Sequence, residues 1–450
     1  MYQKNVTIKL CALIVICIFI AFPLLAGGTK PEEEAMERPA KAEVITITVW
    51  DQFGYEGLTA AGPAMDKLVE IYEERNPNIK IERTYVPQPN IRDQLRIAVS
   101  GGTEPHMWYT WPAAAVLASY ARPGHIIDLT PAANRLGWFN KLPQLIINRN
   151  SYKGKLYAYP TEQDYMLIYY NKDIFREVGI QVPKTYKEFH SNCKKLKSAG
   201  YIPVAFGNRD KWPATNGLSY FFALMAGREL QEEVWFGDTL WNNPSYVEAC
   251  KEFLDWVDRG YFPKGFNGID FGEANSLFMM GDAAMNFTGT WMIEDFVNNA
   301  TFDLGTFFLP QIKPDLPQAT MMGEGSQWSI SSRYPKDEQE ECIKFLDFLM
   351  SEENYKIWIE EGSLVPIVKG GLNWDMFEVS QVIKETFING DKMAQVNGYD
   401  LHTTTPESVT ETLYNNLQLM LDKEITPVQF LKAMDDSWKK AKAADEIWVP

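Results

Sequence analysis

The apolar positions from Val44 onward predict a strand, a helix and a second strand. VITITVW is β-branched and almost continuously apolar or threonine, which is typical of a strand buried in a parallel sheet. The next apolar residues recur at helical spacing, at Met65, Leu68, Val69 and Tyr72. The helical pattern ends at Asn76-Pro77, and Ile79 and Ile81 restart a strand, so this region is predicted to be a βαβ unit.

Helices and short strands alternate along the rest of the chain, which predicts an α/β fold. A capping box from Thr185 to Glu188 starts one helix, and Thr426-Pro427 with Gln429 starts another. Helical apolar stripes are formed by Phe189 and Leu196, by Cys342, Phe345, Leu346 and Leu349, and by Leu413, Leu417, Met420 and Leu421. The last stretch of the chain is predicted to be helical only.

The first 28 residues have the pattern of a signal peptide. Lys4 and Lys9 precede an uncharged apolar run from Leu10 to Ala26, and small residues follow where a peptidase would cut. The run is short for a membrane span, although an uncleaved membrane anchor stays open as the alternative. Residues 29–43 are charged and contain proline, which predicts a flexible tether before the fold.

Length and composition indicate a globular protein of two or more domains. At 450 residues the chain is about three times the usual length of one domain. Aromatic residues make up 13 % and include 14 Trp and 21 Tyr, a surplus that needs a use. The formal charge is −16, with acidic residues dispersed among the lysines, which argues against nucleic acid and against anionic lipid. We therefore expect a neutral or small partner.

Three cysteines lie beyond the signal segment, at Cys193, Cys250 and Cys342. They are odd in number and widely spaced, and no CxxC motif or Cys/His cluster accompanies them. Neither a disulfide framework nor a zinc site is signalled, and we expect no metal and no cofactor. Cys193 and Cys342 fall on helical apolar stripes and are predicted to be small buried hydrophobes.

The sequence offers no catalytic constellation. GEGSQW at 323–328 lacks the second glycine of a nucleophile elbow, and neither GxxxxGK[ST] nor a GxGxxG after the first strand is present. A carboxylate pair for glycoside cleavage stays open, because with 59 acidic residues some pair meets in any cleft. We expect a protein that is not an enzyme.

Six segments, taken in order, carry a resemblance to a known family. They are VITITVWDQF, IRDQLRIAVSGGTEPHMW, SYKGKLYAYP, LIYYNKDIFREVGIQVPKTYKEFHSNCKKLKSAGYIPVAFG, SLFMMGDAAMNFTGTW and KFLDFLMSEENYKIWIEEGSLVPIV. The most specific combination is YYNKDIFREVGI with PKTYKEF, followed later by F-x-x-GDAAM-x-x-x-G-x-W. From Val44 to the C-terminus the chain resembles the extracellular solute-binding proteins of bacterial ABC importers, in the family 1, sugar-binding branch that includes maltose-binding protein.

Two positions depart from the pattern of that family. The family commonly has Asp after Pro in its G-x-x-PD segment, where this chain has His106, so the local turn chemistry is in doubt. Many relatives are lipoproteins cut at a cysteine after Leu-Ala-Gly, but here Leu25-Ala26-Gly27 is followed by Gly28. We therefore expect a periplasmic protein without a lipid anchor at that place.

The resemblance implies two α/β lobes joined by a hinge that the chain crosses three times, closing over one ligand. The crossings are predicted near Pro160, between Pro310 and Gly323, and near Pro366. Lobe one is then formed by residues 44–160 and 322–365, and lobe two by residues 161–321 and 366–450. Ligands of open α/β sheets lie beyond the carboxyl ends of the strands, where polar and aromatic residues gather in this chain.

Trp291 is the first choice for a ligand contact. It follows Gly289-Thr290 at the end of the predicted strand AAMNFTG, and the tryptophan of G-x-W is commonly a sugar platform in the family. A pyranose stacks its apolar face on Trp or Tyr, while Asp, Glu, Asn and Gln bind its hydroxyl rim. The alternative is that Trp291 is a core residue.

The other candidates lie at strand ends or in loops that match the family. They are Asp51, Gln52, Trp111, Glu162, Asp164, Asn208, Asp210, Trp212, Glu324, Gln327, Tyr399 and His402. Trp50 and Trp108 are expected to be core residues instead. For Glu162 and Asp164, a solvated loop position stays open as the alternative. The glycines beside Glu324 would let the backbone approach a ligand.

We interpret the sequence as a periplasmic receptor, expected to be monomeric, that delivers a mono- or oligosaccharide to the permease of an ABC transporter. A receptor of the same fold for glycerol phosphate or a polyamine stays open. Phosphate calls for an Arg or Lys cluster, however, and the candidate loops supply only Arg209 and Lys211. An exported carbohydrate-active enzyme is the other alternative. The sequence does not identify the sugar.

Overall fold

The structure, a computed structural model, describes residues 44–448 except 55–59, 111–113 and 394–397. The predicted signal segment 1–28 and the predicted tether 29–43 both lie outside the described residues. No helix among the residues described is long and apolar enough to cross a membrane.

The predicted βαβ unit is confirmed as β1 (Ile45–Asp51), α1 (Ala61–Arg75) and β2 (Ile79–Tyr85). The two strands pair in parallel, from Ile45 opposite Ile79 to Asp51 opposite Tyr85. The helix buries the stripe that its spacing predicts, Met65, Leu68, Val69 and Tyr72. The helix ends at Arg75, and its C-cap is Asn76, the residue before a proline, where a helix is expected to stop.

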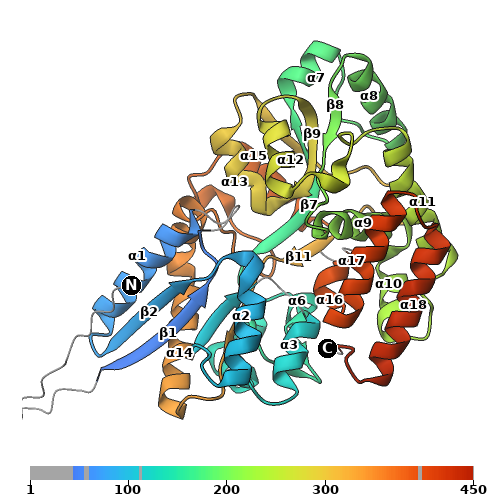
Figure 1. Cartoon of the computed structure of the whole chain (residues 1–450). Helices are drawn as coiled ribbons and strands as arrows, with labels where there is room; N and C mark the ends of the chain where they lie inside the picture. The colour runs from blue at the N-terminus through green and yellow to red at the C-terminus, as the bar shows by residue number, and fades with distance from the viewer. Residues whose placement is uncertain (1–43, 55–59, 111–113, 394–397, 449–450) are drawn as a thin grey trace, which may run out of the picture. The chain divides into compact units, whose positions relative to one another are not determined.

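The first sheet has the strand order β2-β1-β3-β12-β6 (Figure 1). β3 (Met107–Thr110) lies parallel to β1, and β12 (Gln327–Ile330) runs antiparallel between β3 and β6 (Tyr159–Pro160). A late segment of the chain therefore lies between two early strands, so this sheet is complete only after most of the chain has been made.

The second sheet has the order β10-β7-β9-β8, in which β7 (Gln163–Asn171) is the long strand (Figure 1). β9 (Ala283–Gly289) is antiparallel to β7 and parallel to β8 (Ile202–Ala205), and β10 (Leu304–Phe307) is antiparallel to β7. The start of β7 also pairs with β11 (Met322–Glu324). A separate ribbon consists of β4 (Ser151–Tyr152) and β5 (Lys155–Leu156).

The remaining α-helices alternate with these strands and then close the chain. They are α2 (Gln88–Gly101), α3 (Ala114–Ala121), α4 (Thr130–Leu136), α5 (Trp138–Lys141), α6 (Gln144–Arg149), α7 (Lys172–Val178), α8 (Tyr186–Ser198), α9 (Trp212–Met225), α10 (Gly227–Phe236), α11 (Pro244–Asp258), α12 (Phe271–Met279), α13 (Ile293–Asn299), α14 (Lys336–Leu349), α15 (Gln381–Asp391), α16 (Leu401–Thr404), α17 (Glu407–Leu421) and α18 (Pro427–Ala443). In Figure 1 the last two helices, drawn in red, lie beside each other; α17 contacts α9, and α18 contacts α11. The predicted α/β class and the helical C-terminal stretch are confirmed.

Two clusters of buried apolar residues form the cores. One surrounds the first sheet and contains Ile47, Val49, Trp108 and Trp328. The other surrounds β8 and β9 with α9, α11 and α17, and it contains the predicted stripe of Leu413, Leu417, Met420 and Leu421. Trp108 is therefore a core residue, as expected, whereas Trp50 is only partly buried.

Cys193, Cys250 and Cys342 are free and buried, one on each of α8, α11 and α14. Burial raises the pKa of all three thiols well above the usual value. The prediction that Cys193 and Cys342 act as small buried hydrophobes is confirmed.

His106, where the family commonly has Asp, joins β1 to α14. The Thr48 backbone N–H donates to His106 Nδ1 at 3.0 Å, and His106 Nε2 lies 2.9 Å from Glu338 Oε2. The imidazole also stacks on Tyr334, with ring centroids 3.5 Å apart. Burial lowers the pKa of His106, and the Glu338 carboxylate partly opposes this shift. The departure from the family pattern is thus absorbed by an internal hydrogen-bond chain.

The two predicted capping boxes differ. Thr426 Oγ1 accepts from the Gln429 N–H at 3.3 Å, and Gln429 Oε1 accepts from the Thr426 N–H at 2.8 Å, so the box at α18 is complete. Thr185 accepts from the Glu188 N–H at 3.2 Å, but Glu188 accepts from the Lys184 N–H instead of returning the bond. Only half of the second box forms.

Thr426→Ala should lower the free energy of unfolding by about 1 kcal/mol, because it removes the acceptor for the first turn of α18. The shift of the urea midpoint, followed by circular dichroism, measures this change. Thr426→Ser keeps the hydroxyl and should retain most of the stability. Equal midpoints for the Ala and Ser variants would contradict the capping role.

Candidate functional site

Three segments of the chain lie side by side where it passes between the two sheets. On one side of Thr161–Gln163, the Thr161 N–H donates to Ser326 O at 2.9 Å and the Gly325 N–H donates to Glu162 O at 2.7 Å. On the other side, the Gln163 N–H donates to Val365 O at 2.9 Å, and the Ile367 N–H donates to Thr161 O at 3.1 Å. These segments adjoin the predicted crossings, although the lobe boundaries themselves stay a prediction.

Polar side chains gather around the middle segment, and we call them the polar cluster. Its members are Gln52, Tyr109, Glu162, Asp164, Thr290 and Ser326, all of them nearly or fully buried. The Tyr109 hydroxyl donates to Glu162 Oε1 at 2.6 Å, and Gln52 Nε2 donates to Ser326 Oγ at 3.3 Å. The cluster therefore draws on the ends of β1 and β3, the start of β7 and the turn before β12.

Burial raises the pKa of both carboxyl groups in the cluster. The pKa of Glu162 rises to about 8, first because of desolvation and second because Asp164 is close. The pKa of Asp164 rises to about 6 through desolvation, and the hydrogen bond from Thr290 limits the rise. At neutral pH Glu162 is therefore mostly a neutral acid, which can donate one hydrogen bond as well as accept.

Several buried oxygen atoms in this region have no hydrogen-bond partner among the described residues. They include Gln52 Oε1, Glu162 Oε2 and Gln327 Oε1. An unsatisfied buried polar atom costs about 1–3 kcal/mol, and such atoms are uncommon in folded proteins. The three side chains are therefore left ready to bond an incoming polar group.

Gly325 allows the two carboxyl groups to approach the backbone. A Cβ atom at this position would lie 2.3 Å from Asp164 Oδ2 and 2.5 Å from Glu162 Oε1. Any other residue would push both side chains away. The sequence suggested that glycines here let the backbone approach a ligand, but in the structure Gly325 makes room for Glu162 and Asp164.

Trp291 lies in a short 3-10 turn, Thr290–Met292, that is tied to Asp164. The Thr290 hydroxyl donates to Asp164 Oδ1 at 2.8 Å and accepts from the Tyr165 N–H at 3.0 Å. The indole ring lies against Gly289, where a Cβ atom would come within 2.0 Å of it. Gly289 therefore sets the position of the ring, and Thr290 ties the turn that carries it to Asp164.

A second tryptophan stands beside the first. The rings of Trp212 and Trp291 meet edge to face, with centroids 6.0 Å apart, and Trp212 also contacts Phe271 at 4.6 Å. Both indoles are only partly buried, and Trp291 borders both apolar clusters. Trp291 therefore combines contact with the core and an accessible portion of its ring.

Asp51 is bound within the first sheet. It is fully buried, and Arg83 Nε donates to its Oδ2 at 2.8 Å while the Phe53 N–H donates to its Oδ1 at 3.1 Å. Burial raises the pKa of Asp51, and Arg83 opposes the rise. Gln52, the next residue, belongs to the polar cluster instead.

Asn208 and Asp210 hold the starts of two helices. Asn208 Oδ1 accepts from the Ala214 N–H at 3.1 Å in α9, and its Nδ2 donates to Asn267 at 2.7 Å. Asp210 Oδ2 accepts from the Phe271 N–H at 2.9 Å, at the start of α12. Their polar atoms are thus engaged inside the protein, next to Trp212.

The polar atoms of Tyr399 and His402 likewise have partners that do not belong to the polar cluster. The Tyr399 hydroxyl donates to Glu232 at 2.9 Å, and its ring lies under the Arg149 guanidinium at 4.8 Å. His402 Nδ1 lies 3.1 Å from Asp400. Trp111 falls outside the described residues. Glu324 is described only by its backbone, which pairs with Gln163 through β11.

Sequence reasoning missed Tyr109, Thr290 and Ser326. Tyr109 lies in the short buried strand β3, and nothing in the sequence there indicates that its hydroxyl forms a hydrogen bond. Ser326 was considered only as a nucleophile, and Thr290 only as a spacer in G-x-W. A signal was present for one of them, because Thr290 directly follows Gly289 at the end of the predicted strand AAMNFTG.

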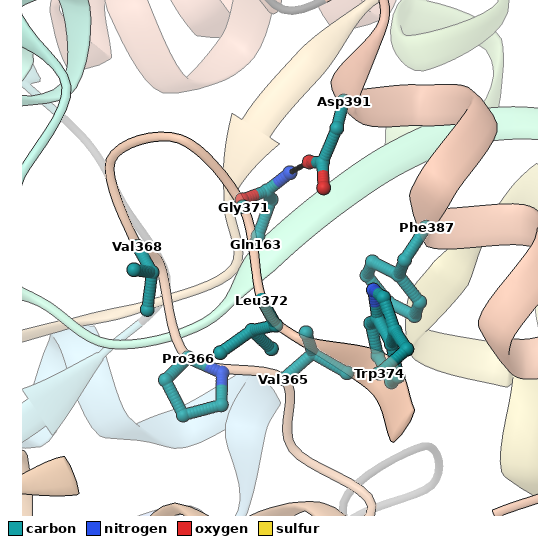
Figure 2. Close-up of a pocket in the computed structure, with 9 residues that line it drawn as sticks. All are labelled: Gln163, Val365, Pro366, Val368, Gly371, Leu372, Trp374, Phe387 and Asp391. Atoms are coloured by element: carbon teal, nitrogen blue, oxygen red, sulfur yellow. Dashed lines mark hydrogen bonds between the residues drawn. The ribbon is translucent and has the colours of Figure 1, made fainter. Parts of the chain in front are cut away.

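A small pocket lies next to the third segment (Figure 2). Val365 and Pro366 line one part, Trp374 another, and Figure 2 shows Gln163 directed at Asp391, with Nε2 to Oδ1 at 2.5 Å. The space between these side chains, open solvent included, is about 180 Å³. The pocket lies beside the crossing segments and carries no assignment of its own.

Glu162→Gln should make the free energy of unfolding less dependent on pH. The pKa of Glu162 is about 8 in the folded state, above its value in the unfolded chain. Between these two pH values the folded state holds a proton that the unfolded state lacks. The free energy of unfolding therefore falls as the pH rises. One such proton gives a slope of at most about 1.4 kcal/mol per pH unit. Unfolding midpoints measured from pH 5 to 8 should therefore fall more steeply for the wild type than for Glu162→Gln.

Glu82→Gln is the matched control, since Glu82 is an exposed acid on β2. It should follow the wild-type pH dependence. Identical slopes for the wild type and Glu162→Gln would show that Glu162 is already ionised in the folded protein.

Known proteins resemble the chain over most of its length. It is 25 % identical over 302 residues to an uncharacterised ABC transporter extracellular-binding protein of Pyrococcus horikoshii, covering 65 % of this chain and 68 % of that one. It is 24 % identical to the multiple sugar-binding protein of Streptococcus mutans, over 70 % and 74 % of the two chains. It is 25 % identical to the sn-glycerol-3-phosphate-binding periplasmic protein of Shigella flexneri, over 72 % and 75 %.

The structural comparison agrees with the predicted two-lobe α/β fold. The solved structure of a chitin oligosaccharide binding protein matches with a TM-score of 0.80, covering 89 % of this chain and 99 % of that one at 23 % identity. The family model described as bacterial extracellular solute-binding protein matches residues 67–378, well over half of the chain. The protein therefore belongs to the bacterial extracellular solute-binding proteins, the family that its sequence segments indicate.

Proposed function

We propose that the protein is a periplasmic receptor that captures a carbohydrate between two lobes and delivers it to the permease of an ABC transporter. The observation that carries this proposal is the combination of buried, unpartnered acceptor oxygens with a partly exposed tryptophan that Thr290 ties to Asp164. A sugar ring needs both features, since its hydroxyls donate to acceptors while its apolar face stacks on an indole.

The roles follow from the contacts. Trp291 supplies the stacking face, and the edge-to-face contact with Trp212 keeps it from turning. Glu162 and Gln52 offer oxygen atoms that lack partners among the described residues. Asp164 accepts from Thr290 through Oδ1, so its Oδ2 is the atom assigned to a sugar hydroxyl.

Ligand entry requires the two predicted lobes to move apart on either side of the polar cluster. Glu162 and Asp164 are only 7 % and 8 % exposed, so a sugar reaches them when the predicted lobes open and is enclosed when they close. Hinge closure of this kind is the general behaviour of periplasmic binding proteins. The hydrogen-bonded segments at Thr161, Ser326 and Ile367 are the place for the hinge.

The similarity to a glycerol phosphate receptor leaves that solute as the second candidate. The charges near the site argue against it, because Asp164, with its pKa of about 6, is ionised at neutral pH, and a phosphate dianion beside it would be repelled. Arg209 is paired with Asp270, and Lys211 donates to Asn415, so both cations of the candidate loop have internal partners. A neutral sugar fits the charges better, and the name of the Streptococcus mutans relative supports it.

A thermal-shift screen with a panel of mono- and oligosaccharides tests the proposal. At a hundred times its Kd a ligand stabilises the folded state by about 2.7 kcal/mol, so a cognate sugar should raise the melting temperature clearly. Sugar analysis after incubation should show no turnover. A response to sn-glycerol 3-phosphate alone would establish the second candidate, and cleavage of an oligosaccharide would identify an enzyme.

Trp291→Ala should weaken binding of the sugar found in that screen by roughly 2 kcal/mol or more, the scale of an aromatic hot spot. The empty protein should lose much less stability than the roughly 3–5 kcal/mol expected for a fully packed tryptophan. Calorimetric titration and urea unfolding of the same variant measure the two effects.

Trp291→Phe is the control, because it keeps an aromatic face and should recover part of the affinity. A large loss of stability with unchanged affinity would instead identify Trp291 as a core residue and remove the stacking role.

A further inference from the structure

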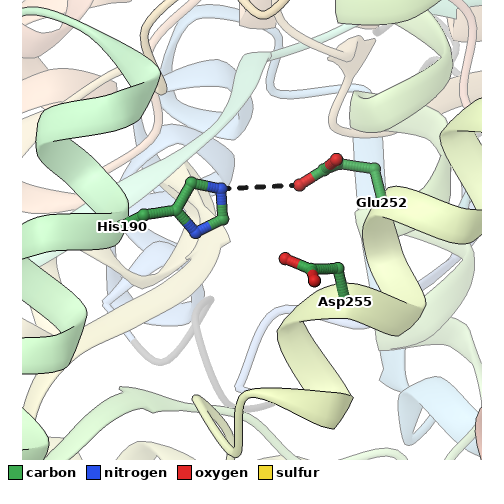
Figure 3. Close-up of side chains that lie close together, drawn as sticks. All are labelled: His190, Glu252 and Asp255. Carbon is green, nitrogen blue, oxygen red and sulfur yellow. Dashed lines mark ion pairs between the residues drawn. The ribbon is translucent and has the colours of Figure 1, made fainter.

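Three side chains with metal-ligating atoms meet between α8 and α11. His190 comes from α8, and Glu252 and Asp255 lie three residues apart on one face of α11. One ligand atom from each lies within 4.8 Å of the other two. Figure 3 shows the imidazole and both carboxylates directed toward a common space between the two helices.

Hydrogen bonds from neighbouring residues orient two of the three groups. His190 Nδ1 lies 2.8 Å from the Tyr261 hydroxyl, so its Nε2 is the nitrogen that faces the carboxylates. Tyr186 donates to Glu252 Oε1 at 2.7 Å, and Trp256 Nε1 donates to the same Tyr186 hydroxyl at 2.7 Å. Such outer partners are typical of built metal sites, where they fix the ring and the carboxylate.

The spacing suits a small transition-metal ion. Ligands at about 2.0–2.2 Å from a tetrahedral ion stand roughly 3.4 Å from one another. His190 Nε2 lies 3.6 Å from Glu252 Oε1, close to that spacing, whereas the full set of three atoms lies within 4.8 Å, so ion binding requires the ligand atoms to move closer together. All three residues are partly exposed, which gives an ion and its remaining water ligands access.

Asp255 has a competing partner. Arg259, one turn later on the same helix side, pairs with Asp255 Oδ2. A carboxylate has two oxygen atoms, so Asp255 can ligate an ion through Oδ1 while Oδ2 keeps the guanidinium. Arg259 therefore steers the Asp255 side chain without closing the site.

We propose that His190, Glu252 and Asp255 form a binding site for Zn²⁺, with water completing the coordination. The imidazole selects zinc over Mg²⁺ and Ca²⁺, which prefer sites made of oxygen ligands alone. The site joins two helices that are far apart in the sequence. It is separate from the polar cluster and does not depend on the identity of the solute.

Titration calorimetry on the chelator-treated protein tests this assignment with ZnCl2 alone. One saturable zinc ion per protein is expected, together with a higher melting temperature, and MgCl2 at the same concentration should produce neither. Glu252→Gln and Asp255→Asn should each weaken zinc binding tenfold or more, because the amides keep the side-chain shape but are poor zinc ligands.

Two controls separate this site from other imidazoles and from a change in charge. Asp258→Asn removes an exposed acid one turn from Asp255, and His125→Gln removes a histidine outside the cluster. Both should keep the affinity within about twofold. Absence of zinc binding overturns the proposal, and so does zinc binding that survives in both Glu252→Gln and Asp255→Asn.

Discussion

The backbone hydrogen bonds of Thr161–Gln163 are the constraint on which the rest of the site depends. They join this segment to Gly325 and Ser326 on one side and to Val365 and Ile367 on the other. Because these bonds use main-chain atoms, they fix the register of segments that lead into both sheets. The positions of Glu162 and Asp164 follow from that register, and through Thr290 so does the turn that carries Trp291.

The burial of two carboxyl groups at this point works against stability. Each is desolvated, and neither has among the described residues the cation partner that a buried carboxylate usually needs. The protein holds them there with neutral donors, Tyr109 for Glu162 and Thr290 for Asp164. Folded proteins keep such local conflicts mainly at functional sites, where the groups have another use.

Local patterns predicted the elements, whereas contacts between distant segments decided the site. Three features were predictable because each shows in a short stretch of sequence. They are the apolar stripe on α1, the strand β9 and the complete capping box at Thr426. Asp51 follows a strand as a binding residue would, but the parallel register of β1 and β2 gives it Arg83 as a partner. His190 was overlooked as a ligand for the same reason, since its carboxylate neighbours are some sixty residues away.

The three buried thiols have a practical consequence for fluorescence labelling of the protein. Because Cys193, Cys250 and Cys342 are enclosed and their pKa values are raised, thiolate is scarce in the folded state and maleimide reagents find no reactive partner among them. Cysteines introduced at exposed positions, one on a helix beside the first sheet and one on a helix beside the second, would then react with maleimide fluorophores. Distance changes between two such dyes can be followed in single molecules without replacing any of these three cysteines.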